Sequence, residues 1–369
     1  VIFRSIRGLG AAMLLANSPA ILTKNFPASQ RGRVLGLQAT MTYLGLTVGP
    51  SLGGFLTQQF SWRAVFYINV PVGLLAFYLS QRYIPRDAVH GRTEAFDIYG
   101  AVLFLAGLVA LLLGLNEGDA WGWTSPAILG LITAALIFLG LFIAVEQHSE
   151  SPMLDLSLFR RRIFSASVTS AILNYVALYG ILFLLPFYLL QGRGFSPATA
   201  GLLLTAQPLV MAVAAPISGA LSDRIGSRIP ATLGMAILAG GLLMLSSLGA
   251  QTPQWLIMLS LAVAGLGTGI FISPNNSALM GSAPRNRQGI AAGMLATARN
   301  VGMVLGVGMA GAIFTTLTTN RPPAALFPAV QAGFLAAAAA AALSSLISAV
   351  RGNGEKQSIL EQQDQKSTS

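Results

Sequence analysis

The sequence is poor in the residues that carry covalent and metal chemistry. It has no cysteine and only two histidines, His90 and His148, among 369 residues. The absence of cysteine excludes disulfide bonds, thiolate nucleophiles and cysteine-based metal sites. The two histidines stand far apart in polar segments, so they cannot form a catalytic or metal-binding cluster. We therefore expect no metal site, no cofactor and no enzymatic activity.

Charge is also scarce. Only 9% of the residues are charged and 54% are hydrophobic, and the mean hydropathy is +0.68, which is too apolar for a water-soluble globule. This composition predicts an all-α, polytopic membrane helix bundle. Because a helix needs about 20 apolar residues to cross the hydrocarbon core, we count eleven candidate spans. They cover residues 1–22, 34–57, 63–83, 98–116, 127–147, 163–191, 197–221, 228–249, 254–279, 287–318 and 329–350.

Basic residues are unevenly divided between the connections of these spans. Sixteen fall on one side, including the C-terminal tail, whereas the opposite connections hold only Arg63, Arg193 and Arg321. Since basic loops stay in the cytoplasm, we expect a multi-pass protein of the cell (inner or plasma) membrane with a cytoplasmic C-terminus. The formal net charge of +10 therefore indicates orientation in a lipid bilayer rather than binding to nucleic acid.

The chain contains an internal repeat with an offset of 257 residues. Gly8–Gly54 aligns without a gap to Gly265–Gly311, and seven of the eight glycines in the first segment meet a glycine in the second. The paired spans run in the same direction, which predicts parallel halves of six helices each. Residues 163–350 form a complete half, whereas residues 1–84 supply only the last three helices of the other. Val1 begins in mid-pattern, so we expect an N-terminally truncated chain with eleven of fourteen helices.

Two further regions complete the expected organisation. Residues 85–162 hold two linker helices without a repeat partner and a cytoplasmic connection. Residues 351–369 are polar and lack apolar periodicity, which predicts a disordered cytoplasmic tail.

Several motifs resemble the major facilitator superfamily and, within it, the fourteen-helix drug:proton antiporter family. RSIRGLGAA (residues 4–12) resembles that family's fourth-helix motif, with Arg7 in place of the usual Gln, and GLTVGPSLGG (residues 45–54) resembles its fifth-helix antiporter motif. SWRAVFYINVPVG (residues 61–73) resembles its entry to helix six, and SPMLDLSLFRRRIF (residues 151–164) its connection into the second half. GALSDRIGSR (residues 219–228) matches its cytoplasmic loop motif. The resemblance covers nearly the whole chain.

The resemblance assigns roles to these motifs. It places proton coupling or substrate contact at Arg4 and Arg7, although Arg4 could instead extend to the outer surface. It implies a cytoplasmic gate formed by Gly219, Asp223, Arg224, Gly226 and Arg228. Asp223 can accept N–H groups at the start of the following helix, where the helix dipole favours an anion; the alternative is a static loop. Arg299, deep in its span, is expected to be a structural tie to a carbonyl or carboxylate.

The resemblance also implies a central substrate cavity. The candidate wall residues are Asn17, Asn174, Tyr175, Tyr179, Asn275 and Asn276. Amides and phenols on an apolar wall suit a bulky amphipathic or cationic ligand, but they equally suit hydrogen bonds between helices.

The antiporter motif contains two separable features. Gly45, Gly49 and Gly53, with Gly54 beside them, form a bare stripe that allows close helix packing, and Pro50 is expected to kink the helix. The repeat keeps the stripe as Gly302, Gly306 and Ala310 but has Val307 in place of Pro50. The stripe therefore predicts shared packing, whereas the proline predicts a role specific to the first half.

The expected function is proton-coupled export of small amphipathic compounds or drugs by alternating access, with protons and the substrate as ligands. An envelope adaptor protein is a further partner that the resemblance leaves open. The alternatives are a narrow-range metabolite exporter of the same fold, an inactive fragment, and a channel or membrane-embedded enzyme. No carboxylate lies deep within a span, so the titrating acid is expected in helices that precede Val1.

Overall fold

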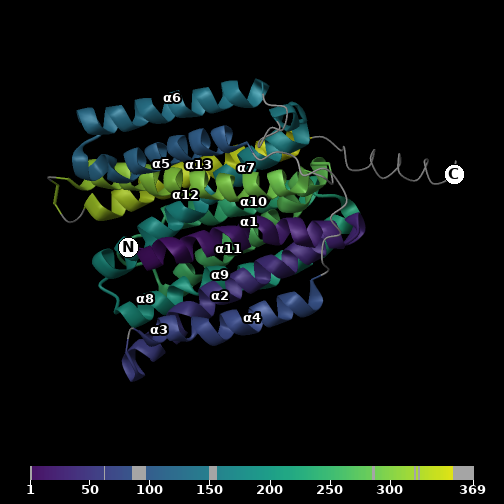
Figure 1. The fold of residues 1–369 in the computed structure, drawn as a ribbon. Helices are drawn as coiled ribbons and strands as arrows, with labels where there is room; N and C mark the ends of the chain where they lie inside the picture. The colour runs from purple at the N-terminus through teal and green to yellow at the C-terminus, as the bar shows by residue number, and fades with distance from the viewer. Residues whose placement is uncertain are drawn as a thin grey trace, which may run out of the picture.

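The computed structural model is a bundle of helices that lie side by side along a common direction (Figure 1). It describes residues 2–61, 63–84, 97–148, 156–284, 287–319, 321–322 and 325–351. Every regular element in these ranges is helical. The expectation of an all-α membrane bundle is therefore confirmed.

The helices coincide with the eleven spans expected from the sequence. Five of the segments precede the complete half: α1 (Ile2–Asn25), α2 (Arg31–Gln59), α3 (Ala64–Tyr67) continued by α4 (Asn69–Tyr83), α5 (Ile98–Trp121) and α6 (Pro126–His148). The other six are α7 (Arg162–Pro186) continued by the π-helical η3 (Phe187–Gly192), α8 (Pro197–Leu204) continued by α9 (Ala206–Ile225), α10 (Arg228–Ser246), α11 (Gln254–Ser282), α12 (Gln288–Thr318) and α13 (Leu326–Val350). Short 3-10 turns, η1 (Ala28–Gln30) and η2 (Leu156–Arg160), precede α2 and α7.

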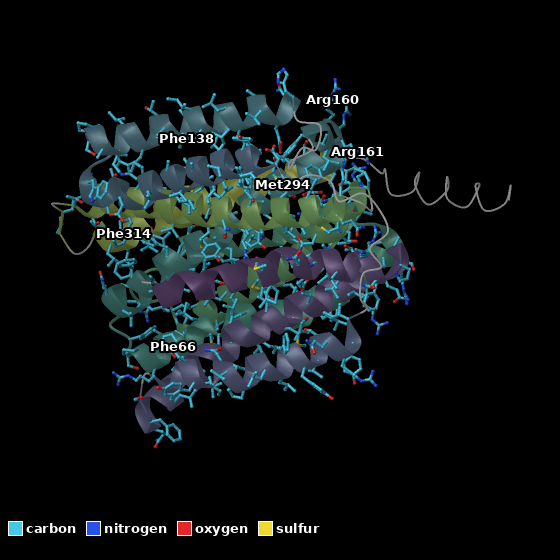
Figure 2. All side chains as sticks on the ribbon, in the orientation of Figure 1. Phe66, Phe138, Arg160, Arg161, Met294 and Phe314 are labelled. Carbon is cyan, nitrogen blue, oxygen red and sulfur yellow. The ribbon has the colours of Figure 1, made fainter. Side chains whose placement is uncertain are left out.

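Length and hydropathy identify eight of the described helices as able to cross a membrane, and Ile98–Gly114 as a shorter apolar helix. α1 and α2 are not among the eight because glycine and polar residues lower their hydropathy. The ends of the bundle differ in chemistry: Arg160 and Arg161 lie at one end, whereas Phe66 and Phe314 lie toward the other (Figure 2). We call the first of these the basic end.

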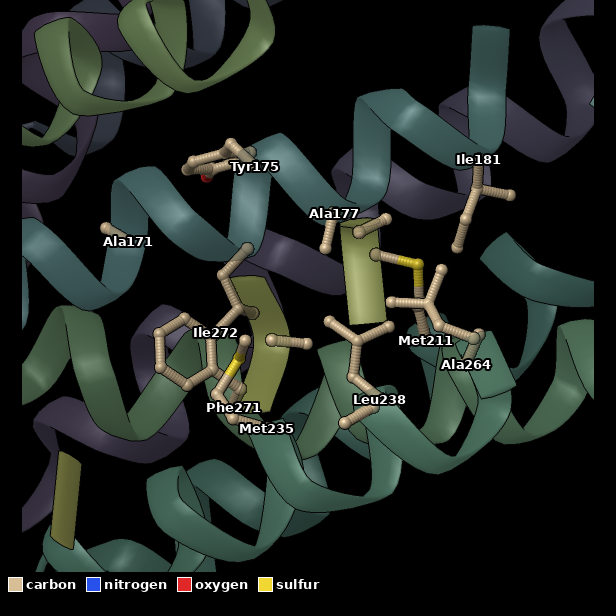
Figure 3. Close-up of a cluster of buried hydrophobic side chains, with 14 of the residues drawn as sticks. Ala171, Tyr175, Ala177, Ile181, Met211, Met235, Leu238, Ala264, Phe271 and Ile272 are labelled. Carbon is tan, nitrogen blue, oxygen red and sulfur yellow. The ribbon is translucent and has the colours of Figure 1, made fainter. Parts of the chain in front are cut away.

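Most of the hydrophobic core lies within the segments α7 to α13, and Leu35 and Tyr43 of α2 join it. Met211, Met235, Leu238, Ala264 and Phe271, from α9, α10 and α11, are almost fully buried and converge in one cluster (Figure 3). By contrast, none of the residues of α4 is buried. The α5–α6 hairpin packs on itself through Phe104 and Phe142, whose ring centroids are 5.1 Å apart, and meets α12 along one edge.

Glycines set the closest helix approaches in this half. On α12, a Cβ at Gly302 would lie 2.6 Å from the carbonyl oxygen of Ile172, and one at Gly306 would lie 2.6 Å from that of Val176. Both distances are shorter than real Cβ contacts allow, so α12 packs directly on the backbone of α7.

The C-terminal tail was predicted to begin at residue 351, which is one residue too early. Arg351 is only 2% exposed and hydrogen-bonds to residues of the bundle, as described below, so it belongs to the fold. The rest of that expected tail, residues 352–369, lies outside the described residues, and the other expected domain limits stay predictions.

The α7–α12 contact gives a stability prediction. Gly306→Ala should lower the free energy of unfolding by about 1–3 kcal/mol, because the added methyl group overpacks the contact with Val176. The melting temperature should fall accordingly. The measurement is the melting curve of the detergent-purified protein followed by fluorescence-detected size-exclusion chromatography.

Gly308→Ala is the matched control, since a Cβ at Gly308 meets no atom within 4 Å. It should leave stability unchanged or raise it by up to about 1 kcal/mol, because alanine is the better helix former. Equal melting curves for the two variants would contradict the close packing of α12 on α7.

Candidate functional site

A cavity of about 160 Å³ lies between α1 and α2 on one side and α7, α11 and α12 on the other. Its polar wall residues come from helices far apart in the sequence. They are Gln38, Thr42 and Tyr43 of α2, Tyr175 and Tyr179 of α7, Asn276 of α11 and Arg299 of α12. We call this space the central cavity.

The central cavity is lined by the same positions of the two repeats. Five pairs of its wall residues are separated by 257 residues: Pro19 with Asn276, Leu35 with Ala292, Gln38 with Leu295, Ala39 with Ala296, and Thr42 with Arg299. The first of these pairs lies on α1 and α11, and the other four lie on α2 and α12. Equivalent faces of equivalent helices therefore supply much of the cavity wall.

Three of the six expected wall residues line this cavity, namely Tyr175, Tyr179 and Asn276. Asn17 is exposed, and its side-chain amide donates to the carbonyl oxygen of Met13 one turn earlier in its own helix, at 2.8 Å. Sequence reasoning missed Gln38, Thr42 and Tyr43. The repeat offset could have found two of them, because it relates Thr42 to Arg299 and Gln38 to the wall residue Leu295.

Asn275, expected in the cavity, belongs to a separate cluster near the basic end. Its side-chain amide donates to the carbonyl oxygen of Ser167 (3.0 Å) and its side-chain oxygen accepts from the guanidinium of Arg351 (3.0 Å). Arg351 also donates to the hydroxyl groups of Ser167 (3.1 Å) and Ser227 (2.6 Å). This cluster ties α7, α11, α13 and the loop before α10 together.

Asn174 is fully buried, and neither atom of its side-chain amide has a hydrogen-bond partner among the described residues. It does not line the central cavity. Its expected place in the substrate wall is therefore not seen.

Arg299 does not form the expected structural tie. Among the described residues, no hydrogen bond or ion pair holds its guanidinium, which stands in the cavity wall beside Tyr175 and Tyr179. It is also the one charged residue among the described residues that line the cavity.

Asp223 joins the two halves at the basic end. Its carboxylate oxygens accept the backbone N–H groups of Gly32 (2.7 Å) and Arg33 (2.9 Å) in the first turn of α2. The sequence predicted that this carboxylate would accept from the start of α10, but these two bonds go to α2, which belongs to the other half. A carboxylate at a helix N-terminus satisfies unpaired donors and interacts favourably with the helix dipole.

Two glycines allow this contact. A Cβ on Gly219 would overlap the carbonyl oxygen of Gly32, and a Cβ on Gly32 would overlap that of Gly219. Gly226 ends α9 with φ of 86°, a conformation that glycine adopts without strain. Asp223 with Gly32 and Gly219 is called the latch below.

Other contacts between the halves accompany the latch. The hydroxyl of Thr40 donates to the carbonyl oxygen of Ala212 (2.9 Å), and that of Thr23 to the side-chain oxygen of Gln288 (3.2 Å). All of these contacts involve the end of α1 or the first ten residues of α2. The halves are thus joined at the basic end.

The antiporter motif departs from its expected packing. A Cβ at Gly45 or Gly49 would meet nothing within 4 Å, so this part of the stripe touches no backbone of the described chain, unlike Gly302 and Gly306 of α12. The helix runs without a break from Arg31 to Gln59, so Pro50 does not end it.

Other expected site residues are not placed in detail. The surroundings of Pro50, Gly53 and Gly54, and the side chains of Arg4 and Arg7, lie outside the described residues. Arg224 lies in the last turn of α9 and Arg228 begins α10, so both lie close to Asp223 in the sequence. No group of three or more potential metal ligands occurs in the part of the chain that the structure describes.

Comparison with protein families agrees with this geometry. The model of the Major Facilitator Superfamily matches residues 1–97, 88–307 and 167–366. The chain belongs to the major facilitator superfamily. It is therefore a multi-pass membrane protein of a family of secondary transporters, which bind small substrates in the membrane and are not enzymes.

Three relatives are similar along most of this chain. The riboflavin transporter RibZ of Clostridioides difficile (strain 630) is 34% identical over 86% of this chain and 69% of its own length. The multidrug resistance protein Stp of Mycobacterium tuberculosis (strain ATCC 25618 / H37Rv) is 32% identical over 84% of this chain. The tetracenomycin C resistance and export protein of Streptomyces glaucescens is 30% identical over 86% of this chain. The chain spans only 58% and 59% of the lengths of the last two relatives.

The latch gives a prediction about conformation. Asp223→Asn should raise the fraction of molecules open at the basic end about tenfold or more, because a hydrogen bond to a charged group contributes about 1.5–3 kcal/mol. Spin labels at Gln30→Cys and Ile229→Cys, both exposed positions, would report the opening as longer distances in double electron–electron resonance. The absence of native cysteine makes the labelling specific.

Asp97→Asn is the control, because Asp97 caps the start of α5, accepting from the N–H of Gly100 at 2.8 Å, away from the latch. It should leave the distances unchanged. A distance distribution for Asp223→Asn that matches that of Asp97→Asn would rule out the latch as a determinant of this state.

Proposed function

We propose that the protein is a proton-coupled exporter of small amphipathic compounds that works by alternating access. The observation that carries this proposal is the central cavity, lined by five pairs of repeat-related positions from two parallel sets of helices. Two such sets can rock about a shared site and expose it to one side at a time. The names of Stp and of the tetracenomycin C resistance and export protein support export as the direction.

The latch supplies one end state of this cycle. The halves touch at the basic end, and this end is proposed to face the cytoplasm because basic loops tend to stay there. Breaking the two bonds of Asp223 to α2 would release that end and open the cavity inward. Since the bonds are made in only one of the two states, they bias the equilibrium between them.

Proton coupling needs a group that titrates within reach of the cavity. No carboxylate lies among the described residues that line it, so the coupling acid is proposed to lie outside this part of the wall. Arg4 and Arg7 are proposed to contribute to proton coupling because they occupy the fourth-helix motif. The glycines and the proline of residues 45–54 are proposed to prevent protons from crossing without substrate.

Dye transport tests the function. Everted membrane vesicles that contain the protein should accumulate amphipathic fluorescent dyes when the lumen is acidic, and dissipating the pH gradient should abolish accumulation. Vesicles without the protein are the control. Movement of riboflavin alone, with no dye transported, would favour a narrow-range exporter, to which the similarity with RibZ points. No transport of any compound in a vesicle that holds its gradient would contradict the proposal.

Pro50 tests the tightness of coupling. Pro50→Ala should let protons leak without substrate, because it restores a backbone hydrogen bond in α2 and alters the helix that borders the cavity. The expected result is a faster collapse of an imposed pH gradient in proteoliposomes, with substrate accumulation reduced at least about threefold if roughly 0.7 kcal/mol of coupling is lost. Pro197→Ala, at the first position of α8, is the control. Unchanged gradients and unchanged accumulation would remove this role from Pro50.

A further inference from the structure

The central cavity has a single charge among the described residues of its wall, and that charge is positive. Arg299 is surrounded by aromatic and uncharged polar groups: Tyr175 and Tyr179 of α7, Thr42 of α2 and Asn276 of α11. A cavity that selected cations would be expected to offer a carboxylate, and none of the described wall residues is acidic.

The carboxylates that the structure describes lie away from the central cavity. Asp223 accepts from the start of α2 and Asp97 from the start of α5, while Glu117 and Glu146 lie on the α5–α6 hairpin. None of them lines the central cavity. The guanidinium of Arg299 is therefore not neutralised from within the described part of the chain.

The depth of Arg299 in the membrane strengthens the attraction between its guanidinium and an anionic group. It is eleven residues after the start of α12, which corresponds to about 16 Å along the helix and to mid-depth in the membrane. At this depth water is scarce, so a charge acts over a longer range than at the surface. A guanidinium also offers a planar fork of donors that matches a carboxylate or another pair of anionic oxygens.

We propose that the central cavity selects planar aromatic substrates that carry an anionic oxygen group, which Arg299 binds while the tyrosines hold the ring. This inference rests on the proposed transport function and names the substrate class for the same site. Tyr43, Tyr175 and Tyr179 supply aromatic surface for stacking. Gln38 and Asn276 supply neutral hydrogen-bonding groups that orient the ligand.

The internal repeat also indicates how the substrate is oriented in the central cavity. The position equivalent to Arg299 in the first half is Thr42, and both line the cavity. Because only one of the two related positions is charged, the anionic end of the substrate faces α12 and its uncharged part faces α2. The sequence resemblance had suggested a bulky amphipathic or cationic ligand, and the charge of the wall favours the anionic class.

Two dyes with one ring skeleton and opposite charge test the proposal. Fluorescein is an anionic xanthene and rhodamine 123 a cationic one, and binding of each to the purified protein can be measured by fluorescence anisotropy. The protein should bind fluorescein roughly tenfold or more tightly than rhodamine 123. Arg299→Gln should weaken fluorescein binding by about 10- to 100-fold, the range expected for a charge-assisted hydrogen bond, without weakening rhodamine 123 binding.

Two further variants complete the design. Arg299→Lys keeps the charge without the planar fork, so it should retain part of the preference, and it serves as the readout if Arg299→Gln does not fold. Arg162→Gln removes an exposed arginine at the start of α7 and should leave both dissociation constants unchanged. Tighter binding of rhodamine 123, no binding of fluorescein, or equal fluorescein binding by the protein and Arg299→Gln would each overturn the proposal.

The same dyes separate this inference from the transport function. Accumulation of rhodamine 123 but not fluorescein in everted vesicles would support export and overturn the anionic preference. Loss of binding of both dyes in Arg299→Gln would overturn it too, because that result indicates a structural arginine paired outside the described residues. If fluorescein binds through Arg299 yet neither dye is transported in a tight vesicle, the transport proposal fails and the assignment of the site is retained.

Discussion

The arrangement of the two halves depends on the carboxylate of Asp223 at the N-terminus of α2. The first turn of a helix leaves backbone donors unsatisfied, and in a membrane protein each such donor is costly unless it finds an acceptor. Asp223 supplies two acceptor oxygens from the opposite half. Gly219 and Gly32 bring the backbones close enough for these bonds to form.

The other contacts between the halves lie at the same end of the bundle as this carboxylate. α2 and α9 are held together near the basic end, and α1 is joined there to α12 through Thr23 and Gln288. The walls of the central cavity then come from α2 and α12 at equivalent positions. The latch and these further contacts all lie at the basic end, and hydrogen bonds that form in one conformation and not in another bias the equilibrium between the two.

The sequence predicted the spans and the repeat well because both depend on patterns that extend over many residues. Hydropathy located all eleven helical segments, and the 257-residue offset relates Pro19 to Asn276 and Thr42 to Arg299 across the cavity. Faces of individual helices were harder to predict. Asn275 and Asn276 are adjacent, yet successive residues point about 100° apart on a helix, so one joins the Arg351 cluster and the other lines the cavity.

Partners across the bundle could not be read from local sequence either. The residues around Asp223 predicted a helix N-terminus as its partner but not which helix, since α2 is 190 residues away. Gly45 and Gly49 share their spacing with Gly302 and Gly306, but close packing also requires a neighbouring helix, and only the pair on α12 has one in the described structure. Arg299 was expected to be neutralised because a buried charge is costly, and its place in a cavity wall became visible only in three dimensions.

In the proposed cycle the central cavity opens to one side of the membrane at a time. The absence of native cysteine allows its most direct measurement: the rate at which a membrane-impermeant maleimide modifies a single cysteine, Ala39→Cys or Ala296→Cys, from each side of oriented vesicles. We expect modification from the side opposite the basic loops, protection from the basic side, and a reversal of this pattern when Asp223→Asn is added. Modification from both sides at once, or from neither side in either background, would contradict it.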